Sequence, residues 1–265
     1  MKVTKWENGA AREEEDELAA EEPLEIRVRG RAISVTMRTP GNDGDDAELA
    51  AGFLLTEGMI RSSADVRKIA LCPRNEMGNV IDVLLEPEVV VDFDKLTRHV
   101  FASSSCGLCG KATIESIQAR YPALEAARQA MVDAPTLAAL PAIMRATQEQ
   151  FARTGGLHAA ALFDCGGKML VLREDVGRHN AVDKVLGHAL LNDWLPLERH
   201  ILLVSGRASF EIMQKALAAR LPIVAAVSAP SSLAVQFAEE SNQTLVGFLR
   251  QGRMNVYSGR GRVRM

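Results

Sequence analysis

The chain has 265 residues, of which 47% are hydrophobic and 25% charged, with a formal net charge of −3. These values suit a globular protein of one large or two modest domains, and the charge balance argues against a nucleic-acid-binding protein. No apolar run reaches the roughly 18 residues of a membrane span and the N-terminus lacks a secretory pattern, so we expect a cytoplasmic protein without a membrane partner.

Residues 1–22 are rich in Glu and Ala and contain an unbroken acidic run from Glu13 to Glu17. Like charges in a block repel one another and usually stay solvated. This segment is therefore predicted to be a disordered acidic tail.

Residues 23–134 are predicted to form a small α+β region. Alternating polar and apolar residues are typical of half-buried strands, and the apolar spacing after residue 45 is that of a helix, which Asp45 or Asp46 could cap. Strands are expected at 25–29, 32–37, 66–71 and 80–85, and a helix at 46–60.

The α+β region ends in a Cys-x-x-Cys loop formed by Cys106 and Cys109. Gly107 and Gly110 leave room for a tight turn or a large partner. Helical spacing begins at Lys111, and a helix N-terminus near a lysine favours thiolate, the form of cysteine that attacks sulfur.

Three chemistries fit this cysteine pair. A structural zinc site needs four ligands, and the other cysteines, Cys72 and Cys165, stand alone in apolar surroundings. A redox dithiol is possible, although the surrounding order of strands and helices differs from that of a thioredoxin domain. A persulfide carrier would use the same thiolate, and the spacing alone does not choose between these three.

Residues 135–265 have a different pattern, which predicts an α/β domain. Continuous apolar strands alternate with amphipathic helices, as in a largely parallel sheet covered on both faces. A linking helix is expected at 135–153, ending at Gly155. Strands are expected at 159–163, 169–172, 201–204, 223–227 and 245–249, with helices at 181–191, 210–220 and 233–241.

Polar side chains gather where these predicted strands meet helices. The stretch from Arg173 to Gly187 is dense in charged residues, and two further junctions start at Val204 and Val227. Ligands of open parallel sheets bind beyond the carboxyl ends of the strands, where these loops should meet. Taken singly, each serine could equally be an ordinary helix cap. The candidate phosphate- or nucleotide-binding residues are Arg178, His179, Asn180, Asp183, Lys184, Ser205, Gly206, Arg207 and Ser209.

A final candidate segment joins two expected strands through a turn at Gly252. Its arginines could bind phosphate, although an exposed hairpin explains them as well. The segment consists of Phe248, Leu249, Arg250, Gln251, Gly252 and Arg253.

His158 invites comparison with zinc deaminases, which pair a His-x-Glu with a later Pro-Cys-x-x-Cys. Ala160 stands where the general acid/base glutamate would be, and the cysteine pair precedes the histidine. We therefore expect no deaminase catalysis, while a related scaffold stays possible.

Together, the Cys106–Gly110 loop, the Arg173–Gly187 stretch and the Val204–Glu211 segment resemble the formate dehydrogenase accessory sulfurtransferase (FdhD-type) family. The similarity extends over most of the chain from about residue 24. It implies a cytidine-deaminase-like α/β domain at 135–265 and a sulfurtransferase that takes part in maturing formate dehydrogenase.

The same resemblance implies the chemistry and the partners. A cysteine desulfurase would load sulfur onto Cys106 as a persulfide, with Cys109 assisting. The recipient would be the molybdenum cofactor that carries two guanine dinucleotides, bound through residues 248–253, and the protein would act as a homodimer. No permanent metal is expected. Two alternatives stay open, a dithiol oxidoreductase and a non-enzymatic chaperone for the molybdenum cofactor.

Overall fold

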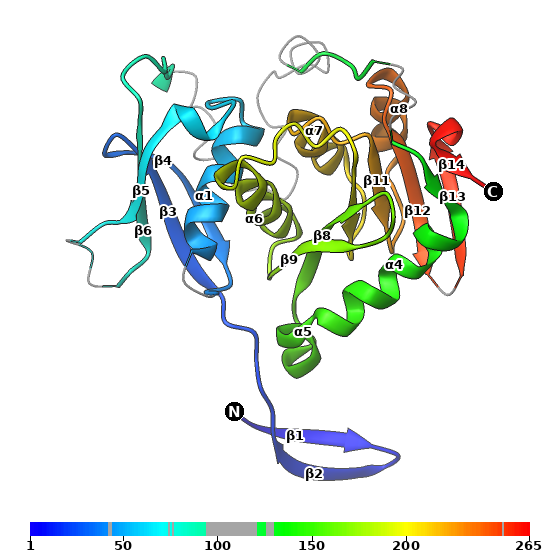
Figure 1. The fold of residues 1–265 in the computed structure, drawn as a ribbon. Helices are drawn as coiled ribbons and strands as arrows, with labels where there is room; N and C mark the ends of the chain where they lie inside the picture. Colours follow the sequence, from blue (N-terminus) through cyan, green and yellow to red (C-terminus); the bar gives the residue numbers. More distant parts are fainter. Residues whose placement is uncertain (42–43, 74, 76, 94–120, 126–129, 251) are drawn as a thin grey trace.

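The computed structural model describes residues 1–41, 44–73, 75, 77–93, 121–125, 130–250 and 252–265. Two sheets form the body of the molecule, one of four strands and one of six, and helices α1 (Asp45–Thr56) and α6 (Arg178–Leu191) lie between them (Figure 1). Among the described helices, none is long and apolar enough to cross a membrane.

The acidic N-terminus differs from the disordered tail expected of it. Strands β1 (Lys2–Glu7) and β2 (Ala10–Glu15) pair in an antiparallel hairpin. The turn falls at Asn8 and Gly9, whose φ angles of 50° and 84° suit the tight turn that Asn-Gly favours. Lys5 and Arg12 form ion pairs with Glu14, and these offset part of the repulsion on which the expectation of disorder rested.

The four-stranded sheet has the order β4-β3-β6-β5, in which only β3 and β6 are parallel. Its inner face carries the alternate apolar residues predicted from the sequence, such as Leu24 and Ile26, which are fully buried against α1. The strands are β3 (Glu22–Val28), β4 (Arg31–Arg38), β5 (Val66–Leu71) and β6 (Val80–Leu85), and the 3-10 helix η1 (Ser63–Asp65) precedes β5.

The six-stranded sheet has the order β13-β12-β11-β10-β8-β9 and is mixed, so the expectation of a largely parallel sheet is wrong. Only the β10–β11 and β11–β12 pairs are parallel. The reason lies in two hairpins, β8–β9 and β12–β13, whose short turns can only return the chain antiparallel. The strands are β8 (His158–Asp164), β9 (Met169–Asp175), β10 (His200–Val204), β11 (Ile223–Ala226), β12 (Thr244–Arg250) and β13 (Arg253–Ser258).

Helices cover both faces of the six-stranded sheet, as predicted. Alternate residues of β10 point to opposite sides, so that Leu202 joins the cluster under α6 while Leu203 joins a second cluster with α4. The first face is covered by α6, α7 (Phe210–Ala218) and α8 (Ser232–Glu240), and the second by α4 (Ala134–Thr147).

The expected linking helix is broken in two. Helix α4 ends at Thr147, and the short α5 (Glu149–Thr154) follows after Gln148, whose ψ of 84° is not helical. Gly155 then ends α5 with a φ of 66°, which confirms the predicted helix stop. Near the C-terminus, the 3-10 helix η2 (Arg260–Arg262) precedes β14 (Val263–Arg264), which pairs with β7 (Val132–Asp133) just before α4.

Candidate functional site

A cavity of about 750 Å³ opens at the carboxyl edge of the parallel strands. Ser205 follows β10, Val227 follows β11 and Arg250 ends β12, and all three line the cavity. His158 lies at the same edge because β8 runs antiparallel to β10. The predicted meeting of strand-end loops is therefore present, and Ser231 N donates to the carbonyl oxygen of Ala208 to tie two of the loops together.

The opposite wall of the cavity comes from α4, α5 and the chain that follows them. Arg145 places its guanidinium 4.3 Å from the centroid of the Phe151 ring, an arrangement stabilised by the cation–π attraction. These residues were missed from the sequence because the segment was read only as a linker, and an Arg and a Phe six positions apart form no known motif. The wall consists of Pro141, Ala142, Met144, Arg145, Gln148, Phe151, Gly155, Gly156 and Leu157.

Arg178, the first residue of α6, is not one of the lining residues but lies near His158, which lines the cavity. A Cβ on Gly206 would lie 3.3 Å from His158 Nδ1 and 3.5 Å from Arg178 Cδ, so the glycine permits this close approach. The Nε of Arg178 is buried without a hydrogen-bond partner among the described residues. Burial, followed by the charge of Arg178, lowers the pKa of His158 below its ordinary 6.5, which leaves this imidazole neutral at pH 7. A buried guanidinium nitrogen without a partner, at a helix N-terminus, favours an anionic ligand.

His179 lies next to this group but turns toward α7. Its Nε2 is 3.3 Å from Ser209 Oγ and 3.3 Å from Glu211 Oε2. Burial, followed by the charge of Arg178, lowers the pKa of His179 to about 3, and burial raises the pKa of Glu211. Ser209 also accepts a hydrogen bond from Ile212 N, so for this serine the capping interpretation is confirmed.

Ser205 keeps a hydrogen-bond donor for a ligand. Its Oγ accepts from Ala159 N at 2.9 Å, which leaves the hydroxyl hydrogen available at the cavity. Gly206 is buried, whereas Arg207 is exposed and does not line the cavity.

The predicted segment from Phe248 to Arg253 forms the tip of the β12–β13 hairpin. Phe248 is exposed with a φ of 52°, a left-handed conformation that is rare for an aromatic residue. Leu249 is fully buried in the core, so its side chain is unavailable to a ligand. Gly252 makes the turn with a φ of 71°, and Arg253 is exposed opposite Arg250. Gln251 lies outside the described residues.

Asn180, Asp183 and Lys184 were predicted to contact a cofactor, and the structure instead commits them to the interior. Asp183 forms an ion pair with Lys215 at 2.8 Å and accepts from Thr56 Oγ1 at 3.0 Å. Asn180 Nδ2 donates to the carbonyl oxygen of Met37 at 2.7 Å. Sequence spacing placed these side chains on a free face of the helix, but α1 and β4 cover that face.

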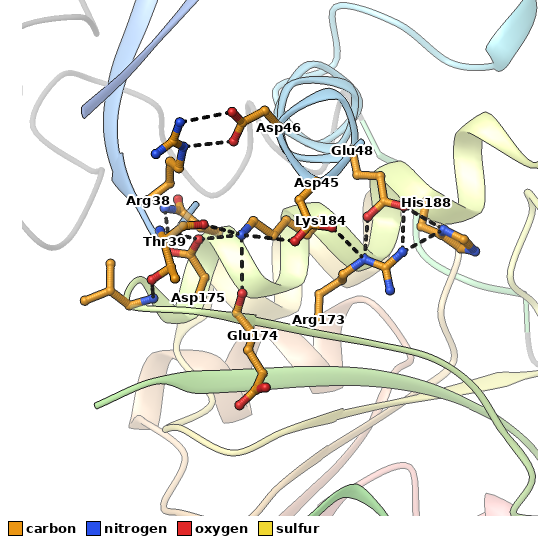
Figure 2. Close-up of polar contacts among 12 residues, drawn as sticks. Arg38, Thr39, Asp45, Asp46, Glu48, Arg173, Glu174, Asp175, Lys184 and His188 are labelled. Atoms are coloured by element: carbon orange, nitrogen blue, oxygen red, sulfur yellow. Dashed lines mark hydrogen bonds and ion pairs between the residues drawn. The ribbon is translucent and has the colours of Figure 1, made fainter. Parts of the chain in front are cut away.

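Figure 2 shows the same arrangement around Lys184, which reaches between α1 and the end of β9. Its Nζ lies 2.8 Å from Asp175 Oδ2 and donates to the carbonyl oxygen of Thr39 at 3.0 Å. Beside it, Arg173 forms a two-pronged pair with Glu48 at 2.6 and 2.7 Å. These contacts join the two halves of the chain and are structural.

Cys106 and Cys109 lie outside the described residues, but the chain on either side is placed. Before the cysteine segment, the Phe93 ring lies 4.3 Å from the guanidinium of Arg31. After it, the Tyr121 hydroxyl lies 3.0 Å from the carbonyl oxygens of both Leu55 and Thr56, at the end of α1. Phe93 and Tyr121 thus contact the N-terminal half of the protein, whereas the carbonyl oxygen of Pro122 accepts a hydrogen bond from Arg220 in the second half.

The other two cysteines lie away from the cavity lining. Burial raises the pKa of Cys165, whose thiol donates to the carbonyl oxygen of Arg199 at 3.3 Å. Among the described residues, no three His, Cys, Asp or Glu side chains gather as a metal site would require.

The chain is 51% identical to the sulfur carrier protein FdhD of Streptomyces coelicolor over 99% of this chain and 94% of that protein. It is 52% identical to the protein of the same name from Mycobacterium tuberculosis, over 93% of this chain and 91% of the relative. A solved structure described as a formate dehydrogenase accessory protein of Desulfotalea psychrophila superposes with a TM-score of 0.78 and 27% identity, covering 99% of this chain and 97% of that one.

The family model for FdhD/NarQ proteins matches residues 19–264, which is nearly the whole chain and includes both the cysteine segment and the cavity. On these grounds the chain belongs to the FdhD/NarQ family.

Proposed function

We propose that the chain is a sulfurtransferase that carries sulfur on Cys106 and delivers it to a molybdenum cofactor bearing two guanine dinucleotides, for use by formate dehydrogenase. The observation that carries the proposal is the cavity at the strand ends, which Arg250, Ser205 and His158 line, together with the partnerless Nε of Arg178, whose side chain lies near His158 around Gly206. The name of the relatives, sulfur carrier protein, supports the cysteine half of the proposal.

The residues present fit a nucleotide. Guanidinium groups pair with phosphate oxygens, and the N-terminus of α6 adds the positive end of its dipole. Arg250 and Ser205 would contact phosphates together with Arg178, while Gly206 lets the ligand approach the backbone. The apolar wall around Phe151 suits a flat base. Arg207 and Arg253, both exposed near the rim loops, would add longer-range attraction for the anion.

In the loading step, the Cys106 thiolate attacks the outer sulfur of the persulfide on a cysteine desulfurase. The new bond forms to that sulfur, the sulfur–sulfur bond of the donor breaks, and the donor cysteine leaves as thiolate. In the delivery step the sulfur–sulfur bond of the Cys106 persulfide breaks and Cys106 is released as thiolate. The molybdenum cofactor, which is the acceptor, supplies the electron pair that converts the transferred sulfur to sulfide. Cys109 assists as the neighbouring thiol.

We further propose that residues 135–265 adopt a cytidine-deaminase-like scaffold. The order of the elements supports this, since a hairpin is followed by α6, and two further strands each lead into a helix. The N-termini of α6 and α7 meet at His179 and Ser209, and neither of the two cysteines that the structure describes, Cys72 and Cys165, contacts these residues. The scaffold would therefore serve ligand binding rather than deamination.

The test is intact-protein mass spectrometry after incubation with a cysteine desulfurase and cysteine. The wild type should gain one sulfur atom that a reductant removes, Cys106→Ala should gain none, and Cys165→Ala, the matched control, should behave as the wild type. Cys106→Ala should also fail to activate formate dehydrogenase while it still binds GDP, the nucleotide probe. A Cys106–Cys109 disulfide without sulfur gain would favour a dithiol oxidoreductase, and full activation by Cys106→Ala would favour a cofactor chaperone.

A further inference from the structure

Gln148 lies in the cavity wall, at the break between α4 and α5. Its backbone nitrogen donates to the carbonyl oxygen of Arg145 at 3.4 Å, and its carbonyl oxygen accepts from Ala152 N at 3.1 Å. Its apolar neighbours in the wall, Met144 and Leu157, are almost fully buried. The fold therefore holds this residue by its backbone on both sides and leaves its side-chain amide as a polar group in a largely apolar surface.

The amide of Gln148 is withdrawn from bulk water but has no hydrogen-bond partner. Only 5% of the residue is exposed, and its side chain forms no hydrogen bond with any residue that the structure describes. The described side-chain atoms that are sealed from solvent without a partner belong to Arg178, His200 and Arg262. The Gln148 amide is not among them, so it still reaches solvent, and the space that it lines is the cavity. An amide without partners costs free energy, so this position favours a ligand that supplies both hydrogen bonds.

The two sides of the cavity differ in chemistry as the two ends of a nucleotide do. On the side of Gln148, the Arg145 guanidinium stacks 4.3 Å from the centroid of the Phe151 ring, and bases stack on aromatic rings and guanidinium planes. On the other side, Ser205 and Arg250 offer a hydroxyl and a guanidinium, which suit phosphate. The volume of about 750 Å³ lies within the range of small-molecule sites. A base is therefore expected on the side of Gln148.

The amide of a glutamine matches one edge of guanine. It carries a carbonyl oxygen that accepts and an NH₂ group that donates, side by side. Guanine presents the complementary pair, because its N1–H donates and its neighbouring O6 accepts. A single polar group of this kind in an apolar surface is how small-molecule sites fix the orientation of a ligand.

We propose that Gln148 recognises the base of a guanine nucleotide, with its Oε1 accepting a hydrogen bond from N1–H and its Nε2 donating one to O6. The inference rests on the proposed function, because it takes a guanine nucleotide as the ligand of the cavity. It adds the residue that contacts the base to the residues that contact the phosphates.

The first experiment changes the residue and the base edge in turn. Gln148→Met removes the amide and keeps the length of the side chain. The probes are GDP and purine riboside 5′-diphosphate, in which hydrogen replaces O6 and N1 carries no proton. In calorimetry the wild type should bind GDP roughly tenfold more tightly than the analogue, because two neutral hydrogen bonds are lost with it. Gln148→Met should lose most of this preference. A wild type without the preference, or a variant that keeps it in full, would overturn the proposal.

Two controls separate base recognition from a general disturbance of the wall. Gln150→Met makes the same substitution two residues along, at a position outside the cavity lining, and should bind GDP as the wild type does. Inorganic pyrophosphate, which has no base, should bind to Gln148→Met as tightly as to the wild type. If Gln148→Met lost GDP and pyrophosphate binding equally, the amide would support the wall instead of the base, and the proposal would be wrong.

The wild type by itself tests the proposed function, and its comparison with Gln148→Met tests base recognition. A wild type that gains sulfur on Cys106 and binds GDP, beside a Gln148→Met variant with the same preference for GDP, would leave the proposed function standing and remove Gln148 from base recognition. A wild type that binds neither GDP nor pyrophosphate would contradict both the nucleotide site of the proposed function and the role of Gln148.

Discussion

Gly187 of α6 and Gly52 of α1 bring two helix backbones into direct contact. A Cβ on Gly187 would lie 2.8 Å from the backbone nitrogen of Gly52 and 1.8 Å from the carbonyl oxygen of Glu48. A Cβ on Gly52 would lie 1.8 Å from the carbonyl oxygen of Asp183. The atoms that a Cβ would meet are backbone atoms, which cannot rotate away as the end of a flexible side chain can. The two halves of the chain are therefore joined by a helix pair that tolerates only hydrogen at these two positions.

Gly52→Ala is expected to separate α1 from α6 and lower the free energy of unfolding by about 1–3 kcal/mol or more, as overpacking of a filled core does. Urea denaturation measures the change. Gly261→Ala is the matched control, because nothing lies within 4 Å of a Cβ built there. Equal stability of the two variants would mean that the helices can shift apart at little cost.

Lys184→Met should be destabilising because it leaves Asp175 charged and fully buried without its ion-pair partner. Removing one member of a buried pair typically costs about 3–5 kcal/mol. Thermal and urea unfolding would register this loss, and Lys168→Met, at an exposed position, should change stability by less than about 0.5 kcal/mol. An unchanged midpoint for Lys184→Met would contradict the structural role assigned to this lysine.

Arg250→Ala should weaken GDP binding, because it removes a guanidinium from the cavity lining. A hydrogen bond to a charged group contributes about 1.5–3 kcal/mol, so calorimetry should show an increase in the dissociation constant of roughly 10- to 150-fold. Arg67→Ala, an exposed substitution on β5 of the other sheet, should bind as the wild type does. Unaltered binding by Arg250→Ala would move the nucleotide away from this cavity.

His179 should make the fold sensitive to acid. Its pKa is lowered from 6.5 to about 3 by burial and by the nearby charges of Arg178 and Lys215. Between these two values the unfolded chain binds the proton and the folded chain does not, so stability falls as pH drops from about 6.5 toward 3. Because the pKa of Glu211 is raised in the folded protein, this carboxyl makes stability rise as the pH falls, which opposes the effect of His179. The contribution of His179 is therefore measured as the difference between two proteins that both keep Glu211.

His179→Gln should therefore lose less stability than the wild type between pH 7 and pH 4.5, with a difference on the order of 1–3 kcal/mol. Urea midpoints at several pH values give both profiles. His200→Gln is the comparison variant. Burial lowers the pKa of His200 too, but His200 lies at the start of β10, the opposite end of the strand from the cavity, so this variant measures the loss of a buried histidine away from Arg178. Parallel profiles for the wild type and His179→Gln would show that His179 titrates normally.

The elements of the second half could be predicted because their strands are continuous apolar runs bounded by polar junctions. The direction of each strand could not be predicted, because the short turns after Asp164 and at Gly252 determine whether the next strand runs parallel or antiparallel. The break at Gln148 could not be predicted from the sequence either, because the residues on both sides of it are compatible with a helix.

For the site, the sequence placed Ser205 and Arg250 correctly at the strand ends and overlooked Arg145 and Phe151. Lys184 was predicted to bind a ligand because a polar residue gives no sign in the sequence that its charge is paired inside the protein. Its ion-pair partner, Asp175, could be recognised only once the fold was known. The cysteine pair stays a prediction, since Cys106 and Cys109 lie outside the described residues.

The antiparallel course of β8 has one more consequence. Because His158 starts that strand, the segment from Gln148 to His158 contributes both the Phe151 wall and one residue of the sheet edge that faces it. Wall and edge are thus covalently continuous through Gly155 and Gly156, and the carboxylate of Glu174 on β9 also holds the wall by accepting hydrogen bonds from Gln150 N at 3.0 Å and Phe151 N at 2.8 Å. Inserting or deleting a single residue in this short connection would change the size of the ligand that the cavity admits, while both sheets stayed as they are.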